Sequence, residues 1–441
     1  MKFPAVEFIS DNFIKPKYSL PKSNQAIYLG PFDLGMAFVQ YMQKGFLFPK
    51  PPSFDQNQMH DFLLNLKESL SLTLVHFYPL AGRFEMVQLE GPNNPPNQAI
   101  YVDCNKGPGA RFIHASAELN MVDIVSPIDV PSIVRSFFDH EGVINYDCGD
   151  QSLMTIQVTE LIHGVFMGFS MNHMVADGTS LWHFLTSFAE IFNSNGNNNN
   201  NNTAISRSPT YDKVFPKGKG PLLSLPFADK NRGDEAEPKL VILRERIFHF
   251  STESVAKLKA KANDNKNNGD CDSRKSSSFQ AVSAHVWRCI TRARKIPSDQ
   301  TTIATLAVDH RSRLVPPASQ NSFGNYVSPV EAAVNCGELL ERSLGWAALL
   351  LHEAVNSQTD ETARDFVETG WVAALSCVGR VLGSGILIGG SSRSNMSGFE
   401  FGFGKAIAIR SGSASLMGKS LCILALKEEA AWIWKSALRL M

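Results

Sequence analysis

An apolar strand that runs directly into an amphipathic helix is the feature that most limits how this chain can fold. Leu161 to Ser170 is apolar and aromatic, which is typical of a buried strand. From Leu181 to Phe192 the apolar residues recur at helical spacing. The connecting residues, Met171 to Ser180, read Met-Asn-His-Met-Val-Ala-Asp-Gly-Thr-Ser. We therefore expect His173 where a strand ends and a helix begins, a place where a side chain is held rigidly.

His173 and Asp177 allow a chemical and a structural interpretation. A neutral imidazole here could accept the proton of an alcohol or amine while that group attacks a carbonyl. The His-x-x-x-Asp spacing is weak evidence alone, because the chain has 11 histidines and such a pair can arise by chance. Asp177 precedes Gly178 and could equally be a turn residue or a helix cap. These residues alone leave both interpretations open.

Several further blocks follow one another in a recognisable order. They are Tyr-Pro-Leu-Ala-Gly-Arg at 78–83, Ser-Phe-Gln-Ala-Val-Ser-Ala-His-Val-Trp-Arg at 278–288, Val-Asp-His-Arg-Ser-Arg-Leu at 308–314, Phe-Gly-Asn at 323–325 and Glu-Phe-Gly-Phe-Gly-Lys at 400–405. Together with the His173 segment, this order resembles the plant BAHD acyltransferases, which use coenzyme A (CoA) thioesters. The resemblance extends from Val6 to about Gly412, nearly the whole chain.

The pattern of elements predicts an α/β fold. Helices are expected at 56–72, 179–193, 252–264, 278–294 and 337–357, and strands at 28–31, 98–103, 153–160, 165–171, 243–250, 302–309 and 405–410. A chain of 441 residues should form two domains. We expect an N-terminal domain at 1–205, a Pro-rich crossover linker at 206–224 and a C-terminal domain at 225–441. The resemblance makes these two similar chloramphenicol-acetyltransferase-like domains, with mixed β-sheets flanked by helices and an active-site channel at their interface.

Composition excludes several classes of function. Lys plus Arg equals Asp plus Glu at 42 each, so no global field favours nucleic acid or an anionic membrane. The asparagine-rich stretch 193–202 and the polar stretch 262–276 are expected to be exposed loops, the first of them disordered. The mildly apolar run from Trp371 to Gly390 carries Arg380 and five glycines, so we expect it in the core rather than in a membrane. The N-terminal residues show no signal-peptide pattern. We expect a cytoplasmic monomer. The seven cysteines lack metal-ligand spacing and are expected to be reduced and buried: Cys104, Cys148, Cys271, Cys289, Cys336, Cys377 and Cys422.

The resemblance implies roles for the residues of the central motif. His173 would be the general base, and the oxyanion formed on attack would need hydrogen-bond donors. Asp177 would be architectural, pointing away from the base and pairing with Arg311, or in second place with Arg313. Acyl-CoA would be the co-substrate and a small molecule the acceptor, with no metal or redox cofactor required.

Binding of CoA makes separate demands on the chain. Ser276, Ser277 and Ser278 precede or open the 278–294 helix, where backbone N–H groups attract anions, and by resemblance they lie along the CoA arm. Arg292 and Arg294 could bind its phosphates or be solvated charges on the helix surface. The remaining histidines are interpreted as ordinary structural residues, among them His163, His183, His285 and His310.

Two segments depart from the family pattern. The signature Asp-Phe-Gly-Trp-Gly-Lys is replaced by Glu400, Phe401, Gly402, Phe403, Gly404 and Lys405, and its role is expected to be structural. Just before it, Ser391, Ser394 and Ser397 stand where bulky aromatic residues are expected. This change enlarges the acyl pocket and leaves the oxyanion donor open, with Ser391 and Ser392 as candidates.

The C-terminal tail does not align with the family at all. The stretch 426–441 reads as a plausible helix in its own right. Codons for 427–436, read in a shifted frame, can spell Gly-Gly-Gly-Ser-Met-Asp-Leu-Glu-Ile-Cys, which is the family's Gly-rich loop and final strand. We therefore expect a reading-frame shift, and with it the loss of a core strand, an exposed sheet edge and poor packing of the tail.

Three functional hypotheses follow. The leading one is an acyl-CoA-dependent O- or N-acyltransferase of plant specialised metabolism. A second is a related enzyme with lyase-type chemistry on an ester-like substrate. A third is a catalytically impaired copy that only binds small molecules, for which the altered tail and 389–398 segment argue and the intact His173 and Asp177 do not.

Overall fold

The structure is a computed structural model of the 441-residue chain. It describes residues 5–19, 26–88, 98–195, 204–218, 223, 243–264, 275–374, 384–390, 399–412, 419–424 and 432–439. The chain divides into two compact units. Unit 1 comprises Met1–Lys239, Ser319–Tyr326 and Ser397–Ser413; unit 2 comprises Leu240–Ala318, Val327–Met396 and Ala414–Met441. Two segments from the second half of the chain, 319–326 and 397–413, thus belong to unit 1, which differs from the contiguous domains expected at 1–205 and 225–441.

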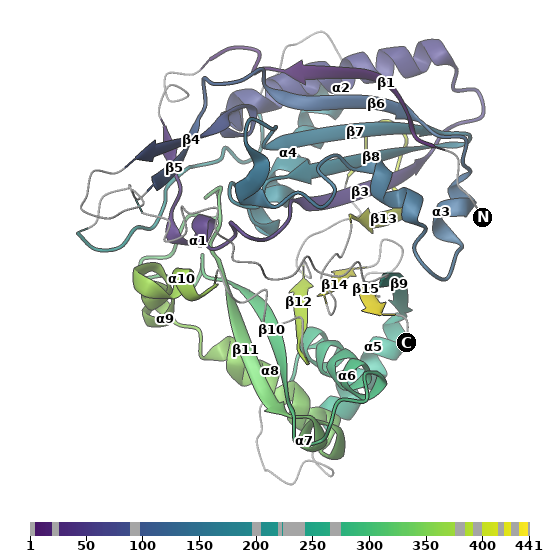
Figure 1. The fold of residues 1–441 in the computed structure, drawn as a ribbon. Coiled ribbons are helices and arrows are strands. Elements are labelled where there is room, and N and C mark those ends of the chain that lie inside the picture. Colours follow the sequence, from purple (N-terminus) through teal and green to yellow (C-terminus); the bar gives the residue numbers. More distant parts are fainter. Residues whose placement is uncertain are drawn as a thin grey trace, which may run out of the picture. The chain divides into compact units, whose positions relative to one another are not determined.

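Unit 1 is built on a six-stranded mixed sheet with the order β1-β6-β7-β8-β3-β13 (Figure 1). Only β6 and β7 run parallel, and the other neighbours are antiparallel. In this order, the strands are β1 (Glu7–Ile14), β6 (Ala110–Ser116), β7 (Met154–Leu161), β8 (Gly164–Met171), β3 (Met42–Pro49) and β13 (Ala408–Ser411). The short β13 comes from one of the C-terminal segments and pairs with β3, so the distant signature region is tied to this sheet.

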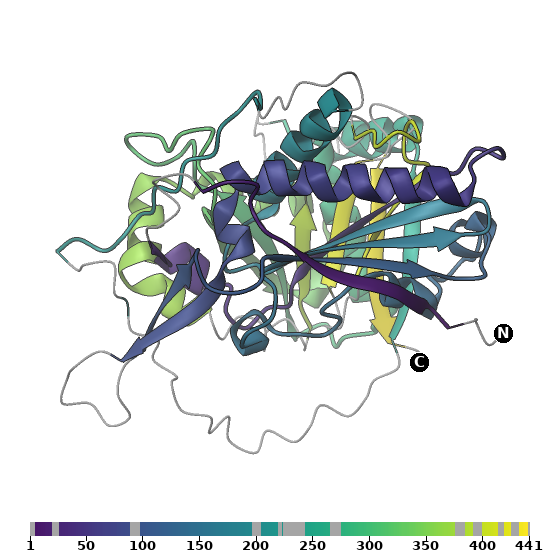
Figure 2. The same cartoon turned by 90° about the horizontal axis from the view of Figure 1, so that it is seen from above.

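The central strands β7 and β8 are buried along their whole length because both faces of the sheet are covered. On one face lie α2 (Gln56–His76) and α4 (Gly178–Asn195), which pack against each other (Figures 1 and 2). Phe169 of β8 meets Phe188 of α4 at a ring distance of 6.5 Å. On the other face Phe166 meets Phe137 at 4.9 Å. A Cβ at Gly168 would lie 2.2 Å from the Phe137 carbonyl oxygen, so only glycine allows this close approach.

Smaller elements complete unit 1. A three-stranded sheet has the order β2-β5-β4, with β2 (Ile27–Tyr28), β5 (Gln98–Asp103) and β4 (Arg83–Gln88). Short helical turns are α1 (Pro31–Leu34), η2 (Tyr78–Ala81), α3 (Met121–Val125), η3 (Ser132–Phe137) and η4 (Asn145–Cys148). Helix α2 is preceded by Asp55, whose side chain accepts the Gln58 N–H at 2.8 Å and so caps the helix.

Unit 2 contains a second six-stranded mixed sheet with the order β11-β10-β12-β14-β15-β9. Its strands are β11 (Val327–Asn335), β10 (Thr301–Asp309), β12 (Ile386–Gly390), β14 (Lys419–Leu424), β15 (Trp432–Arg439) and β9 (Leu243–Phe250). Its helices are α5 (Thr252–Ala262), α6 (Ser278–Ala293), α7 (Cys336–Glu341), α8 (Leu344–Asn356), α9 (Asp360–Asp365) and α10 (Trp371–Ala374), with the turn η5 (Phe366–Gly370) between the last two. Trp287 of α6 is fully buried and its indole N–H donates to Thr302 Oγ1 of β10 at 3.0 Å, which fixes the helix on the sheet.

Two predictions about the second half of the chain are wrong. The helix expected at 337–357 is broken into α7 and α8, because Ser343 accepts the Trp346 N–H and starts a new helix. The tail is not helical: 432–439 form β15, which pairs with both β14 and β9. Sheet pairing on two sides outweighs the helical pattern of the tail, and the strand expected to be missing is present. Cys289 is exposed and Cys104 partly exposed, whereas Cys336 is buried as expected.

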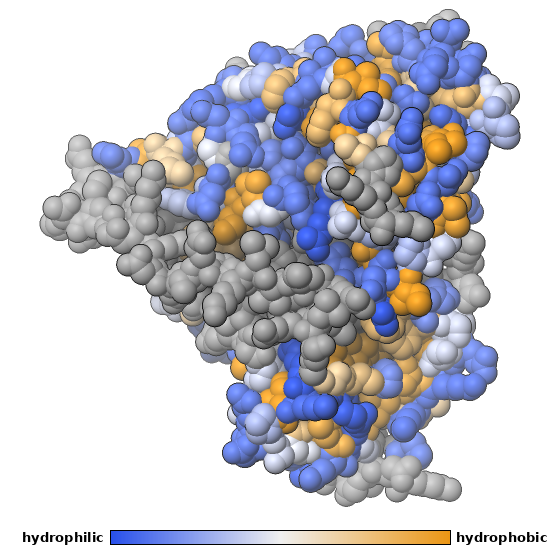
Figure 3. Space-filling model, turned by 45° about the vertical axis from the view of Figure 1, so that its right-hand side comes forward, coloured by the Kyte–Doolittle hydropathy of each residue, from blue (hydrophilic) through white to orange (hydrophobic). Residues whose placement is uncertain are grey.

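Several expectations fall on residues outside the described part of the chain. They concern most of the asparagine-rich stretch, most of the 262–276 loop, and Ser391, Ser392, Ser394 and Ser397. Among the described helices none is long and apolar enough to cross a membrane. On the face shown in Figure 3, hydrophilic and hydrophobic residues are intermixed, which is usual for a protein surface.

Candidate active site

His173 follows β8 directly and is half-buried. Its backbone N–H donates to Asn145 Oδ1 at 2.8 Å. The preceding Asn172 donates from Nδ2 to the Asn145 carbonyl at 3.0 Å and accepts the Met174 N–H at 2.9 Å. Two fully buried asparagine side chains therefore fix the backbone on both sides of the imidazole.

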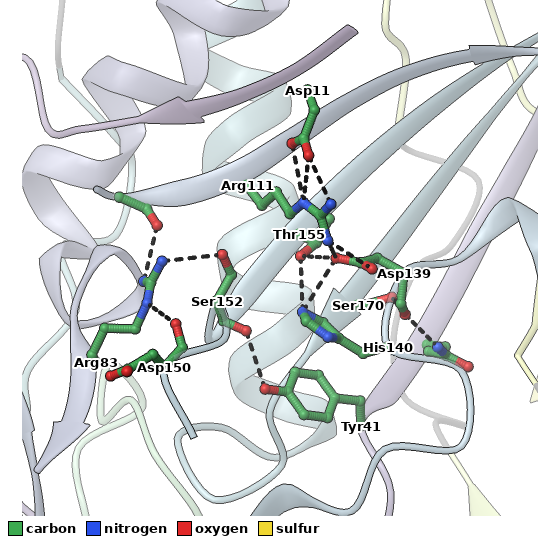
Figure 4. Close-up of polar contacts among 12 residues, drawn as sticks. Asp11, Tyr41, Arg83, Arg111, Asp139, His140, Asp150, Ser152, Thr155 and Ser170 are labelled. Carbon is green, nitrogen blue, oxygen red and sulfur yellow. Dashed lines mark hydrogen bonds and ion pairs between the residues drawn. The ribbon is translucent and has the colours of Figure 1, made fainter. Parts of the chain in front are cut away.

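The loop that supplies Asn145 is itself fastened at both ends, at its start to the six-stranded sheet and at its end to β4 of the three-stranded sheet (Figure 4). At its start, the Asp139 carboxylate binds Arg111 Nη1 at 3.0 Å and accepts the Thr155 hydroxyl at 3.0 Å. At its end, Arg83, only 2% exposed, donates from Nε to the Asp150 carbonyl at 2.9 Å. His140 follows Asp139 in this loop. Burial lowers the pKa of His140, so its side chain is neutral at physiological pH. The loop thus presents Asn145 from a rigid frame.

Asn325 determines which nitrogen of His173 carries the proton. Its Nδ2 donates to Asp33 Oδ1 at 3.0 Å and to the His173 carbonyl at 2.8 Å, both of which can only accept. Asn325 Oδ1 then faces His173 Nδ1 at 3.3 Å. An amide oxygen accepts, so Nδ1 carries the N–H, and in the neutral tautomer Nε2 is the unprotonated nitrogen. The contact with Asn325 thus selects the Nδ1–H tautomer of the neutral imidazole.

Asp33 is the buried charge behind this arrangement. Its carboxylate is fully buried in unit 1 and accepts the backbone N–H groups of Gly30 at 2.9 Å and Asn325 at 3.0 Å. Lys213 pairs with it at 2.9 Å, and the lysine side chain is only 8% exposed. No local sequence pattern marks Asp33, Lys213 or Asn145 as part of the site.

Asp177 is fully buried and caps α4. Its carboxylate accepts the Ser180 N–H at 2.9 Å and the Tyr326 N–H at 3.1 Å. Ser180 Oγ in turn donates to the Gly324 carbonyl at 2.8 Å. The aspartate therefore joins the start of α4 to the segment that carries Asn325, which is an architectural role.

The other predicted site residues lie in unit 2 or in the signature segment. Arg311 is 6% exposed, follows β10 and pairs with Asp309 at 3.1 Å, while Arg313 Nη1 donates to the Gln358 carbonyl. The pairing of Asp177 with Arg311 or Arg313 stays a prediction. Because 391–398 lie outside the described residues, the oxyanion role of Ser391 and Ser392 stays one as well.

The serines proposed for CoA differ in what they can offer. Ser276 is buried, and its backbone N–H donates to Asn263 Oδ1 at 2.8 Å. Ser277 is the N-cap of α6, and its hydroxyl oxygen accepts the Gln280 N–H at 3.2 Å. Ser278 is the first residue of the helix, and Arg292 is exposed in its last turn.

The signature segment packs in the core of unit 1. Phe401 is fully buried against Phe169, Phe188 and Phe192. Phe403 meets Phe62 at a ring distance of 4.6 Å. Gly402 and Gly404 have positive φ of 77° and 73°, which favours glycine. Glu400 bridges to Lys405 through the backbone. This packing supports the structural role expected for Glu400 to Gly404.

A cavity of about 240 Å³ lies in unit 1 beside the loop that carries Asn145. It is lined by Phe84, Glu85, Met86, Ile100, Tyr146, Gly149, Asp150 and Met174. Tyr146 and Met174 are the chain neighbours of Asn145 and His173. Within the described residues, no group of three or more His, Cys, Asp or Glu could hold a metal ion.

Comparison with known proteins decides the family. The model of the Transferase family matches residues 4–438. The chain belongs to this family, the BAHD acyltransferases. It is 34% identical over 433 residues to an uncharacterised acetyltransferase of Arabidopsis thaliana, covering 96% of this chain and 93% of that protein.

Solved structures agree on the fold. Vinorine synthase matches with a TM-score of 0.72 at 18% identity, over 99% of this chain and 95% of that one. TRI101 of F. graminearum, complexed with CoA and deoxynivalenol, matches with a TM-score of 0.69 at 15% identity, over 94% and 95%. The predicted two-domain α/β fold is confirmed.

Proposed function

We propose that this protein transfers an acyl group from acyl-CoA to a hydroxyl or amine of a small plant metabolite, with His173 as general base. Family membership supports acyl-CoA-dependent transfer. The single observation that carries the role of His173 is its contact with Asn325, because that contact leaves Nε2 as the unprotonated nitrogen.

The chemistry needs no more than a positioned base and an oxyanion donor. His173 Nε2 removes the proton of the acceptor hydroxyl or amine as the nucleophile attacks the thioester carbonyl carbon. The tetrahedral intermediate collapses, the C–S bond breaks, and the imidazolium returns the proton to the departing thiolate. The products are the acylated acceptor and free CoA, and His173 ends in its starting state.

Rigid placement of the imidazole supports this role. Its backbone is held by Asn145 and its Nδ1 by Asn325, so the base needs little reorganisation during the reaction. The proposal keeps Ser391 or Ser392 as the oxyanion donor and places Ser276, Ser277, Ser278 and Arg292 along the CoA arm. It also takes the enzyme to be a cytoplasmic monomer, which fluorescent tagging and light scattering would test.

The experiment is an acyl-transfer screen with purified protein. A panel of acyl-CoAs is incubated with plant metabolite extract, products are identified by mass, and thiol release is followed in parallel. We expect an acylated product that requires both CoA thioester and acceptor, and that is lost in folded His173→Ala. Turnover of a single substrate without CoA would instead indicate the lyase hypothesis, and CoA binding without turnover the impaired copy.

A further inference from the structure

We propose that the buried Asp33–Lys213 pair sets the basicity of His173, acting through Asn325. This inference rests on the proposed function, because it assigns Asp33 and Lys213 as positioning residues for that base. Neither residue touches the imidazole, and the effect is carried by one intervening amide.

The contacts form a continuous chain of hydrogen bonds. Lys213 Nζ lies 2.9 and 3.0 Å from the two Asp33 oxygens. Asp33 Oδ1 accepts Asn325 Nδ2 at 3.0 Å, and Asn325 Oδ1 faces His173 Nδ1 at 3.3 Å. A carboxylate on the Nδ2 side polarises the amide and makes its oxygen a stronger acceptor for the imidazole N–H. The negative charge therefore favours the imidazolium form, and the lysine moderates this effect.

The placement of Lys213 is tight, which suits a fixed charge. A Cβ at Gly324, whose φ is 138°, would lie 2.1 Å from Lys213 Nζ. Glycine at this position leaves the space in which the ammonium group reaches the buried carboxylate. The chain neighbour of Gly324 is Asn325, so the same turn admits the lysine and presents the amide to His173.

Removing one member of the pair should shift the titration of His173 in a direction that depends on which member is removed. Lys213→Met leaves Asp33 uncompensated and stabilises the imidazolium, whereas Asp33→Asn leaves the ammonium and disfavours it. A unit charge that is separated from the imidazole by one amide group shifts its pKa by on the order of 1 at an effective dielectric constant of about 20. A further charge within the motif is Asp177, whose carboxylate accepts the Ser180 and Tyr326 N–H groups and is unchanged in every variant.

The test is an NMR titration of protein labelled with ¹⁵N and ¹³C in histidine, with the His173 signals assigned from His173→Ala. We expect an Nδ1–H tautomer in the wild type. The His173 pKa should rise by about 1 in Lys213→Met, fall by about 1 in Asp33→Asn, and return to within a few tenths of wild type in the double variant. The acid limb of kcat/KM for acyl transfer should move in the same directions. The NMR titration gives its answer even where acyl transfer fails, so failure of the proposed function and failure of this inference are distinguishable.

Glu160→Gln is the matched control. Glu160 is another buried carboxylate of unit 1, paired with His114 at 2.8 Å and Lys50 at 3.8 Å, but it lies at the opposite end of β7 from the His173 turn. It should lower stability without moving the His173 pKa. Shifts of the same sign in Lys213→Met and Asp33→Asn, no shift in either, or an equal shift in Glu160→Gln would overturn the inference. Where Asp33→Asn does not fold, an unchanged pKa in Lys213→Met is enough to overturn it.

Discussion

Asp177 offers the sharpest test of what the central motif does. Asp177→Ala removes the acceptor of two backbone N–H groups, those of Ser180 and Tyr326. Loss of the helix cap costs about 1 kcal/mol. The Tyr326 N–H, left without a partner in a buried site, costs about 1–3 kcal/mol more. We therefore expect the free energy of unfolding to fall by about 2–4 kcal/mol, which for a unit of this size lowers Tm by about 5–15 °C.

The assay combines chemical unfolding with acyl-transfer kinetics on the same preparations. Asp55→Ala is the control, because Asp55 caps α2 in the same way at an exposed position and should cost only about 1 kcal/mol. An Asp177 pair with Arg311 would raise the loss by a further 3–5 kcal/mol or so, since removing one member leaves a buried charge. A double-mutant cycle with Arg311→Met measures that coupling. Full loss of activity in Asp177→Ala at unchanged Tm would refute the architectural assignment and make Asp177 chemical.

Four further predictions follow from the described residues. His173→Ala should keep the wild-type Tm while turnover falls at least ~10²-fold, and near-normal turnover would remove its role as base. Asn325→Ala should lower turnover by about tenfold and leave a mixture of imidazole tautomers detectable by NMR, whereas an unchanged Nδ1–H tautomer would contradict the assignment. Burial lowers the pKa of His310 to about 4, so the unfolded state binds more protons than the folded state between about pH 6.5 and 4. The free energy of unfolding should therefore fall by up to about 3 kcal/mol on acidification through that range. His310→Gln should abolish this loss in urea titrations. Sequencing the transcript across codons 412–441 tests the frame shift, and a nucleotide sequence that cannot encode the shifted peptide would end that hypothesis.

Local patterns predicted the elements around the site well. The apolar run before His173 became β8 and the periodic run after it α4, because both are long and each is buried on the side its pattern indicates. The helix predicted for the tail was wrong because contacts with distant strands outweighed the local pattern. Trp432–Arg439 has a plausible helical pattern, but β14 and β9 offer backbone partners on both sides and the segment pairs as a strand.

The supporting residues of the site could not be predicted because they act through distant backbone. Asp33 and Asn325 are separated by 292 residues in the chain and meet only after folding. Asn145 is one of many asparagines, and nothing in its local sequence shows that its side chain binds the His173 N–H. Phe-Gly-Asn at 323–325 was recognised as a motif. The role of Asn325 became clear only from the position of its side-chain amide beside His173.

The four-residue spacing of His173 and Asp177 has a structural explanation in this unit. His173 contacts Asn325 through its ring, and Asp177 binds the neighbouring Tyr326 through its backbone N–H. The backbone N–H of Asp177 also donates to the carbonyl of Gly324, the residue before Asn325, at 3.3 Å. The two motif residues therefore bind one three-residue segment from two sides, and neither needs to contact the other. A shorter or longer spacing would move the start of α4 relative to that segment and separate the base from Asn325. The geometry of this segment, rather than a direct acid–base pair, therefore accounts for the four-residue spacing.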